Sequence, residues 1–283
     1  MLVNLKEILE IAEKNNTAIG MFNATGLDSL QAVISAAEEL SQPVIIAHAE
    51  VHNIYNDVFL VAPAMIAMAK AAKVPVCVHL DHGTSLDMIW RALRLGFTSV
   101  MIDASALPYE ENLRLTKMVT DIAHSMGVSV EAELGRLVTG ESGEAASDMT
   151  MRPEDYYTDP DEARAFCKAT GVDALAIAFG TSHGFYKSEP KLSFDVIKKV
   201  KEATGLPLVM HGGSGVSEEG FKESIRCGIR KINYYSYMSA AGYDAAREVI
   251  ESGKTKYLHD VEFAAMKAMR EDVKRAISVF SGK

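Results

Sequence analysis

Short runs of β-branched and apolar residues alternate with longer amphipathic stretches along the whole chain. The strands that this pattern predicts span 18–22, 44–48, 76–80, 99–103, 129–134, 174–178, 207–211 and 230–233. The amphipathic stretches that predict helices include 28–39, 85–95, 111–126, 161–170, 194–204, 218–227 and 239–251. Strands that alternate with helices form a parallel sheet, and eight such units favour a closed (β/α)8 TIM barrel of the α/β class.

An open, doubly wound sheet is the alternative arrangement of such units. No Gly-x-Gly-x-x-Gly motif follows the first predicted strand, although that motif is typical of one large group of open sheets. The chain has 283 residues, and barrels commonly use about 250 residues as one domain. No low-complexity linker divides it, so we expect a single domain over residues 1–283. The longest irregular stretches are 135–160 and 254–260.

The charge and the cysteines limit the partners and the compartment. A net charge of −9 argues against nucleic acids and anionic membranes, because both are bound through basic patches. Three widely separated cysteines indicate reduced thiols rather than a disulfide framework. The N-terminus has the pattern of an amphipathic helix and lacks the apolar centre of a signal peptide. The longest apolar run, 58–69, is shorter than the roughly 20 residues of a membrane span. We therefore expect a soluble, cytoplasmic protein.

Polar side chains gather at or just past the carboxyl ends of the predicted strands. They are Asn23, His48, Asp81, His82, Asp103, Glu133, His183, His211 and Asn233. In a barrel, active sites are built at this end of the strands. The sequence therefore predicts a functional site there.

Three of the four histidines in this set, His82, His183 and His211, come from widely separated segments. Neutral imidazole is the commonest protein ligand of catalytic transition metals. Three protein ligands with one open position are usual for catalytic zinc. Asp81 directly precedes the first histidine, where a carboxylate could donate or accept a proton beside the metal. A buried polar pair that caps a strand is the simpler interpretation of any one residue, but the shared placement of all three histidines favours a metal.

The segment Val-Glu-Ala-Glu-Leu-Gly at 130–135 places two carboxylates on one face of a predicted strand. Bare carboxylates inside a barrel are costly, so they need a cation, a proton or hydrogen bonds. Glu133 could hold a second metal together with Asp103. Alternatively, Glu133 forms a hydrogen bond to a metal-ligating histidine, His82 or His183. We favour this supporting role.

A glycine-rich turn, His-Gly-Gly-Ser-Gly at 211–215, follows the seventh predicted strand. Exposed backbone N–H groups and the start of the next helix suit an anion. Barrels often bind phosphate with the loops after strands 7 and 8. The candidate phosphate-binding residues are Gly184, Lys187, Gly212, Gly213, Ser214, Asn233 and Ser236.

Five segments together resemble the class II, zinc-dependent ketose-bisphosphate aldolases, the family of fructose- and tagatose-bisphosphate aldolases. They are Val-His-Leu-Asp-His-Gly-Thr-Ser, Met-Ile-Asp-Ala-Ser, Val-Glu-Ala-Glu-Leu-Gly, Gly-Thr-Ser-His-Gly-Phe-Tyr-Lys and His-Gly-Gly-Ser-Gly-Val. The resemblance covers essentially the whole chain. It implies a TIM barrel, a homodimer or homotetramer, and the reversible cleavage of a ketose phosphate to dihydroxyacetone phosphate and an aldehyde.

The same resemblance implies roles for individual residues. His82, His183 and His211 are expected to hold a catalytic Zn²⁺, and Asp81 to exchange a proton with the C4 hydroxyl of the ketose. The residues implied around the substrate are Asn23, Gly184, Lys187, Gly212, Ser214, Asn233 and Ser236. A monovalent cation near the His-Gly loops is a further implied cofactor.

The chain departs from the family pattern in ways that bear on the substrate. In the long loop, a serine replaces the second of two adjacent acids, so Glu141 and Glu144 are the candidates for the acid that acts at C3. His48 lies where the family has serine or threonine near the phosphate, and Tyr235 replaces aspartate or alanine. Asp260 aligns with an arginine that binds the distal phosphate, often across the subunit interface. A carboxylate there would repel that phosphate.

We therefore predict a zinc-dependent class II aldolase that acts on a ketose 1-phosphate or on an unusual ketose bisphosphate. An ordinary fructose-1,6- or tagatose-1,6-bisphosphate aldolase is the first alternative. A weakly catalytic homologue that binds a sugar phosphate as a sensor is the second. The altered acidic loop favours the sensor slightly, whereas Asp81 and the three histidines argue against it.

Overall fold

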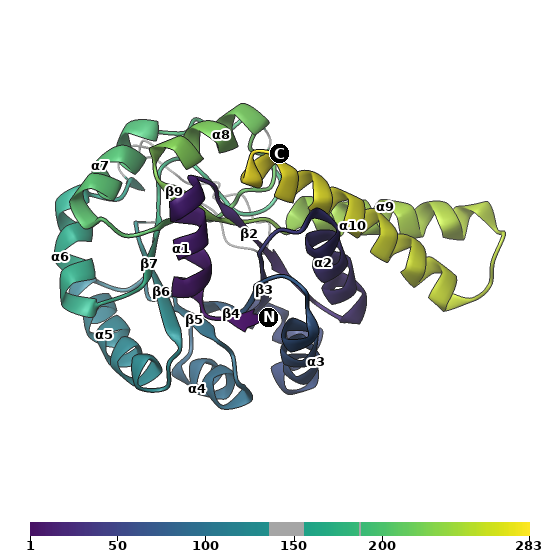
Figure 1. Ribbon diagram of the computed structural model, residues 1–283, viewed down its shortest axis with the longest axis horizontal. Helices are drawn as coiled ribbons and strands as arrows, with labels where there is room; N and C mark the ends of the chain where they lie inside the picture. The colour runs from purple at the N-terminus through teal and green to yellow at the C-terminus, as the bar shows by residue number, and fades with distance from the viewer. Residues whose placement is uncertain (136–155, 187) are drawn as a thin grey trace.

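The computed structural model describes residues 1–135, 156–186 and 188–283, and these form a closed barrel of parallel strands surrounded by helices (Figure 1). The strands are β1 (Leu2–Val3), β2 (Ile19–Asn23), β3 (Val44–Ala49), β4 (Val76–Gly83), β5 (Ser99–Ile102), β6 (Ser129–Leu134), β7 (Ala174–Ile177), β8 (Leu208–Met210) and β9 (Ile229–Asn233). Their order is β1-β4-β3-β2-β9-β8-β7-β6-β5, and a further pairing of β4 with β5 closes the ring. The predicted TIM barrel is confirmed.

Helices follow the strands and cover the outside of the barrel. They are α1 (Leu5–Asn15), α2 (Leu27–Leu40), α3 (Val58–Ala71), α4 (Leu86–Leu95), α5 (Tyr109–Ser125), α6 (Pro160–Thr170), α7 (Phe194–Thr204), α8 (Glu218–Cys227), α9 (Ser236–Ser252) and α10 (Leu258–Ser281). A 3-10 helix, η1 (Glu50–Ile54), follows β3. Side-chain caps fix several helix starts. Asn4 and Glu7 form a capping box at α1, and Ser85 accepts from the backbone N–H of Met88 at α4.

Two elements differ from what the sequence pattern predicts. The N-terminal helix begins at Leu5 rather than at the first residue, because Leu2–Val3 pair with the start of β4 as a short strand. α3 is not among the predicted helices. Apart from Lys70 its residues are apolar, and Pro63 lies inside it, so it lacks the amphipathic period by which surface helices are recognised.

α1 closes the amino-terminal end of the barrel. Its apolar side chains pack in one cluster with those that point into the barrel: Leu5, Ile8, Leu9, Ala12, Ile19, Met21, Ile45, Ala47, Cys77, Ala174, Ala176 and Val209. A larger apolar cluster fills the layer between the strands and the surrounding helices. Because apolar side chains occupy one end of the barrel, the polar groups of its interior lie toward the other end, where the strands finish.

α9 and α10 form a helical hairpin, residues 236–281, that extends away from the barrel (Figure 1). We refer to it as the helical arm. α10 has 24 residues, which corresponds to about 36 Å at 1.5 Å per residue. Several large apolar side chains of the arm are exposed: Tyr243, Ile250, Tyr257, Leu258 and Phe263. Within the described ranges, every helix is too short or too polar to traverse a lipid bilayer.

Candidate active site

Three histidines from separate strands meet at the carboxyl end of the barrel. His82 lies near the end of β4, His183 in the loop after β7, and His211 directly after β8. Nε2 of His82 lies 3.3 Å from Nε2 of His183 and 2.8 Å from Nδ1 of His211. The three ring nitrogens therefore face a common point, and the three side chains could hold one metal ion together.

The backbone at His82 explains how two consecutive residues reach the same site. In a regular strand, Asp81 and His82 would point to opposite faces. The pairing of β4 with β5 shifts its register between Leu80 and Gly83, and His82 has a φ of 44°. This left-handed conformation costs a residue with a Cβ atom roughly 1–2 kcal/mol. Backbone strain of this kind clusters at functional sites.

Two carboxylates contact the histidine rings from behind. Nδ1 of His82 lies 2.7 Å from Oδ2 of Asp103, and Nε2 of His211 lies 2.9 Å from Oε1 of Glu131. A carboxylate on the far nitrogen fixes the tautomer and the orientation of a metal-ligating histidine. The sequence pattern predicts this supporting role for Glu133. In the structure, Asp103 fills it for His82 and Glu131 fills it for His211.

Glu133 belongs to a second group of possible metal ligands, with His82 and Asp103. Its Oε2 atom is buried and has no hydrogen-bond partner among the described residues. Burial, together with the negative charge of Asp103, raises the pKa of Glu133 to about 8. A cation beside these carboxylates would remove the penalty of burying them, so the chemistry of the donor set suits a divalent ion.

The charges around the three-histidine group also favour a cation. Burial acts to lower the pKa of His82, but the carboxylates of Asp81, Asp103 and Glu133 outweigh it and raise this pKa to about 10. These carboxylates stabilise a positive charge on the imidazole, whether it is a proton or a metal ion. Burial also lowers the pKa of His211, which favours the neutral ring that a metal requires.

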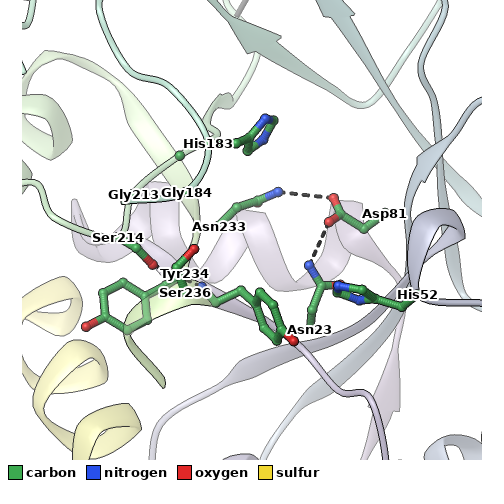
Figure 2. Close-up of a pocket in the computed structure, with 12 residues that line it drawn as sticks. Asn23, His52, Asp81, His183, Gly184, Gly213, Ser214, Asn233, Tyr234 and Ser236 are labelled. Carbon is green, nitrogen blue, oxygen red and sulfur yellow. Dashed lines mark hydrogen bonds between the residues drawn. The ribbon is translucent and has the colours of Figure 1, made fainter. Parts of the chain in front are cut away.

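Asp81 is buried, and two amide side chains hold both of its oxygens. Nδ2 of Asn23 donates to Oδ2 at 2.8 Å, and Nδ2 of Asn233 donates to Oδ1 at 3.1 Å (Figure 2). Burial acts to raise the pKa of Asp81, but the positive charges of His82 and Lys231 hold that pKa well below its usual range. Asp81 is therefore an ionised carboxylate in a fixed orientation.

A buried lysine connects the two halves of the site. Nζ of Lys231 lies 2.9 Å from Oε2 of Glu131 and donates to Oδ1 of Asn233 at 2.8 Å. Since Glu131 contacts His211 and Asn233 contacts Asp81, one series of polar contacts joins the histidine to the carboxylate. Lys231 is not among the site residues predicted from the sequence. Its position two residues before Asn233, on the same face of β9, is the signal that could have identified it.

Figure 2 shows the pocket beside these residues. The predicted residues that line it are Asn23, Asp81, His183, Gly184, Gly212, Gly213, Ser214, Asn233 and Ser236. His52, Tyr234 and Tyr235 line it as well. His52 is not among the predicted site residues, because it lies within η1, beyond the end of the preceding strand.

The glycine-rich loops form one wall of the pocket. Gly212 has a φ of 65°, and a Cβ atom at this position would lie 2.1 Å from the carbonyl oxygen of Ser182. Only glycine fits there. Oγ of Ser214 accepts from the backbone N–H of Tyr235 at 3.2 Å, so it lies at the N-terminus of α9. Backbone N–H groups and a helix N-terminus make this wall suitable for a phosphate.

One predicted residue lies away from the pocket, and three others cannot be placed. Asp260 lies at the start of α10, near the tip of the helical arm (Figure 1), where it accepts a hydrogen bond from Thr255. Lys187, Glu141 and Glu144 lie outside the described residues.

Comparison with known families and proteins agrees with this geometry. The sequence profile described as "Fructose-bisphosphate aldolase class-II" matches residues 3–283. The chain is 41% identical to a fructose-bisphosphate aldolase from Geobacillus stearothermophilus, over 90% of this chain and 88% of that protein. It is 39% identical to a fructose-bisphosphate aldolase from Staphylococcus epidermidis, over 99% of this chain and 97% of that protein.

Solved structures share the same architecture. The YdjI aldolase from Escherichia coli K12 has a TM-score of 0.86 and 37% sequence identity, and the match covers 99% of this chain and 97% of that chain. A putative fructose-1,6-bisphosphate aldolase from Coccidioides immitis has a TM-score of 0.88 and 30% identity, with 98% and 96% covered.

Proposed function

Since the chain belongs to the class II fructose-bisphosphate aldolase family and is an aldehyde-lyase, we propose that its substrate is a ketose 1-phosphate without a second phosphate. Cleavage of this substrate gives dihydroxyacetone phosphate and an aldehyde. The observation that carries the proposal is a single pocket in which Asp81 faces glycine-rich loops beside three convergent histidines.

The proposed metal is Zn²⁺, held by His82, His183 and His211. Three imidazole ligands are typical of catalytic zinc. Carboxylates behind two of the rings, Asp103 and Glu131, are the partners that orient zinc-bound histidines. When bound, the ion supplies a Lewis acid that polarises the carbonyl group of the substrate. A monovalent cation near the His-Gly loops, which the family resemblance implies, belongs to the same proposal.

Asp81 accepts the proton of the C4 hydroxyl in this proposal, because its carboxylate is ionised and held by Asn23 and Asn233. As the proton leaves, the C4–O bond becomes the carbonyl of the aldehyde and the C3–C4 bond breaks. The electron pair of that bond stays with the dihydroxyacetone phosphate half, which then needs a proton at C3. Glu141 and Glu144 are the candidates for the acid that supplies it, and both lie outside the described residues.

The phosphate of the three-carbon half is assigned to the glycine-rich wall. The backbone N–H group of Ser214 and the N-terminus of α9 at Ser236 offer hydrogen bonds and a partial positive charge. Lys187 is the candidate for a full positive charge beside this phosphate. Its placement lies outside the described residues.

The charges of the pocket support one phosphate rather than two. Among the described residues that line the pocket there is no arginine or lysine. Arginine and lysine are the side chains that usually hold a phosphate dianion. The negative charge of Asp81 lies in the same cavity, so a second dianion would be repelled unless other residues neutralised it. The glycine-rich wall accounts for one phosphate only.

An ordinary fructose-1,6- or tagatose-1,6-bisphosphate aldolase is the second candidate. The names of the curated relatives favour it. In that case the distal phosphate would be bound by residues from outside this pocket, such as the helical arm of a partner subunit.

The kcat/KM values for fructose 1-phosphate and for fructose 1,6-bisphosphate, read as release of dihydroxyacetone phosphate, separate the two candidates. We expect the 1-phosphate to be preferred by about tenfold or more, because a charge-assisted hydrogen bond to phosphate contributes about 1.5–3 kcal/mol where it exists.

Asp260→Arg should shift the ratio toward the bisphosphate if the arm reaches a partner's pocket. Asp244→Arg, an exposed site on the same arm, is the control. A wild-type preference for the bisphosphate would establish the second candidate.

We also propose that the protein forms a homodimer or homotetramer through the helical arm. The arm projects from the barrel and exposes Tyr243, Ile250, Tyr257, Leu258 and Phe263. Grouped apolar side chains on a projecting element mark protein–protein contact surfaces.

A cytoplasmic location is the last part of the proposal. Cys77, Cys167 and Cys227 are buried and free, which fits a reducing compartment. Recovery of the protein with the exported fraction of its source cells would contradict this location.

A further inference from the structure

One wall of the pocket is formed by a residue without an assigned role, His52 of η1. Figure 2 shows its ring beside Asn23 and Asp81, across the pocket from Gly213 and Ser214. The side chain is 7% exposed. Its Nδ1 atom is buried and has no hydrogen-bond partner within the described part of the chain. Oδ1 of Asn23, on the same wall, is likewise buried and unpartnered there.

Neighbouring contacts fix the position of this wall. Oε2 of Glu50, at the start of η1, accepts from the backbone N–H groups of Thr84 at 2.7 Å and Ser85 at 3.0 Å. η1 is thereby tied to the loop that follows β4, which carries Asp81. The ring of Tyr235 lies 4.9 Å from the ring of His52, measured between centroids. The imidazole therefore has little freedom to turn away from the pocket.

Two unsatisfied polar groups on a fixed wall are the signature of a hydrogen-bonding ligand, because buried polar groups in folded proteins otherwise have partners. Burial lowers the pKa of His52, so the ring is mainly neutral at neutral pH and can donate from one nitrogen while it accepts at the other. A hydroxyl group matches this wall, since it can accept from the imidazole and donate to Oδ1 of Asn23.

The position of the wall identifies which hydroxyl it would contact. The proposed phosphate wall, Gly213 and Ser214, lies on the opposite side, and the C4 hydroxyl lies at Asp81, which is on the same side of the pocket as His52. The carbon after C4 is therefore the part of the substrate that reaches His52. We propose that His52, together with Asn23, binds the hydroxyl on this carbon and thereby selects aldehydes with a 2-hydroxyl group. This inference rests on the proposed aldolase function.

The test is the condensation of dihydroxyacetone phosphate with glyceraldehyde or with propanal, which lacks the 2-hydroxyl. We expect the wild-type kcat/KM to favour glyceraldehyde, and His52→Leu to reduce the glyceraldehyde-to-propanal ratio by about tenfold, with little change for propanal. His52→Gln, which keeps a donor and an acceptor, should retain most of the wild-type ratio. The intrinsic reactivity of each aldehyde is the same with every variant. It therefore contributes equally to all the ratios and does not affect their comparison.

Two controls make the outcome interpretable. His124→Leu changes an exposed histidine of α5 and should leave the ratio at the wild-type value. Exchange of the C3 proton of dihydroxyacetone phosphate with solvent, without aldehyde, should occur at similar rates in all variants. Normal exchange with an unchanged ratio in His52→Leu would overturn the role of His52 alone. Absence of exchange in the zinc-loaded wild-type protein would instead overturn the proposed function.

Discussion

Asp81 is the residue on which the proposed proton transfer depends. It lies at a strand end facing the pocket, so Asp81→Ala should preserve the fold and the metal content. Cleavage should fall by about 10²–10⁴-fold, the usual effect of losing a positioned acid or base. Turnover, circular dichroism and zinc content measured together test this. Asp87→Ala, an exposed acid of α4, is the control. Turnover near the wild-type rate in Asp81→Ala would remove Asp81 from the mechanism.

The buried ion pair of Lys231 and Glu131 holds two residues of the site, because Glu131 contacts His211 and Lys231 contacts Asn233. Lys231→Met leaves a buried carboxylate uncompensated, and we expect it to lower the free energy of unfolding by about 3–5 kcal/mol. The double variant Lys231→Met, Glu131→Gln should recover part of this loss because no buried charge is then unpaired. Chemical denaturation measures both. Lys199→Met breaks an exposed pair and should change stability by less than about 1 kcal/mol. Equal losses in the two single lysine variants would contradict this account.

At the residue scale, the sequence indicates which residues belong to the site better than it indicates which residues contact one another. The three histidines and Asp81 could be grouped in advance because each lies at or shortly after a strand end, and the structure brings them together. The choice between the two acids of β6 could not be made. Both point inward, and only the neighbouring strand β9, far away in sequence, places Lys231 against Glu131. A contact of this kind depends on packing and not on local pattern.

At the scale of elements, the strands were predictable and several connections were not. All eight predicted strands overlap observed strands, because β-branched runs bounded by turns are a strong local signal. α3 has a single polar residue, Lys70, so its sequence carries no amphipathic period. η1, which carries His52, is a short 3-10 turn without a repeating pattern. Prediction therefore failed where local periodicity is absent.

The helical arm provides the prediction at this scale. Replacing Tyr257, Leu258 and Phe263 together by serine should shift the protein from an oligomer to a monomer. Each substitution removes exposed apolar surface that an interface through the arm would bury. Light scattering after size-exclusion chromatography gives the mass. Ile122→Ser changes an exposed apolar residue of α5 and should leave the mass unchanged. A monomeric wild-type protein would rule out the arm as an interface under these conditions.

At the scale of the whole molecule, eight strand-and-helix units determine the barrel, and the barrel determines where the site forms. The repeat was visible in the sequence. The pairing of β5 with β4, which closes the ring, was not, because it depends on strand tilt and stagger around the whole sheet. The apolar cluster at α1 leaves the carboxyl end of the barrel for polar groups. Closure of the ring of strands thus brings Asn23 and Asn233 together at Asp81, although the sequence separates these two asparagines by 210 residues.

A metal ion bound by three separate segments should stabilise the whole fold. Zn²⁺ at 1,000 times its dissociation constant adds about 4 kcal/mol to the free energy of unfolding if it binds only the folded state. The melting temperature should therefore rise with zinc concentration in the wild-type protein. The rise should be much smaller in His211→Ala, which lacks one of the three ligands.

The most direct test of the central claim is zinc titration of metal-free protein, with bound metal and cleavage activity measured on the same samples. We expect one ion per chain in the wild-type protein and activity that returns in proportion to bound zinc. We expect loss of both in His211→Ala and neither loss in His124→Ala. Full activity without metal, or one tightly bound ion per chain in His211→Ala, would contradict the claim that His82, His183 and His211 hold the catalytic ion.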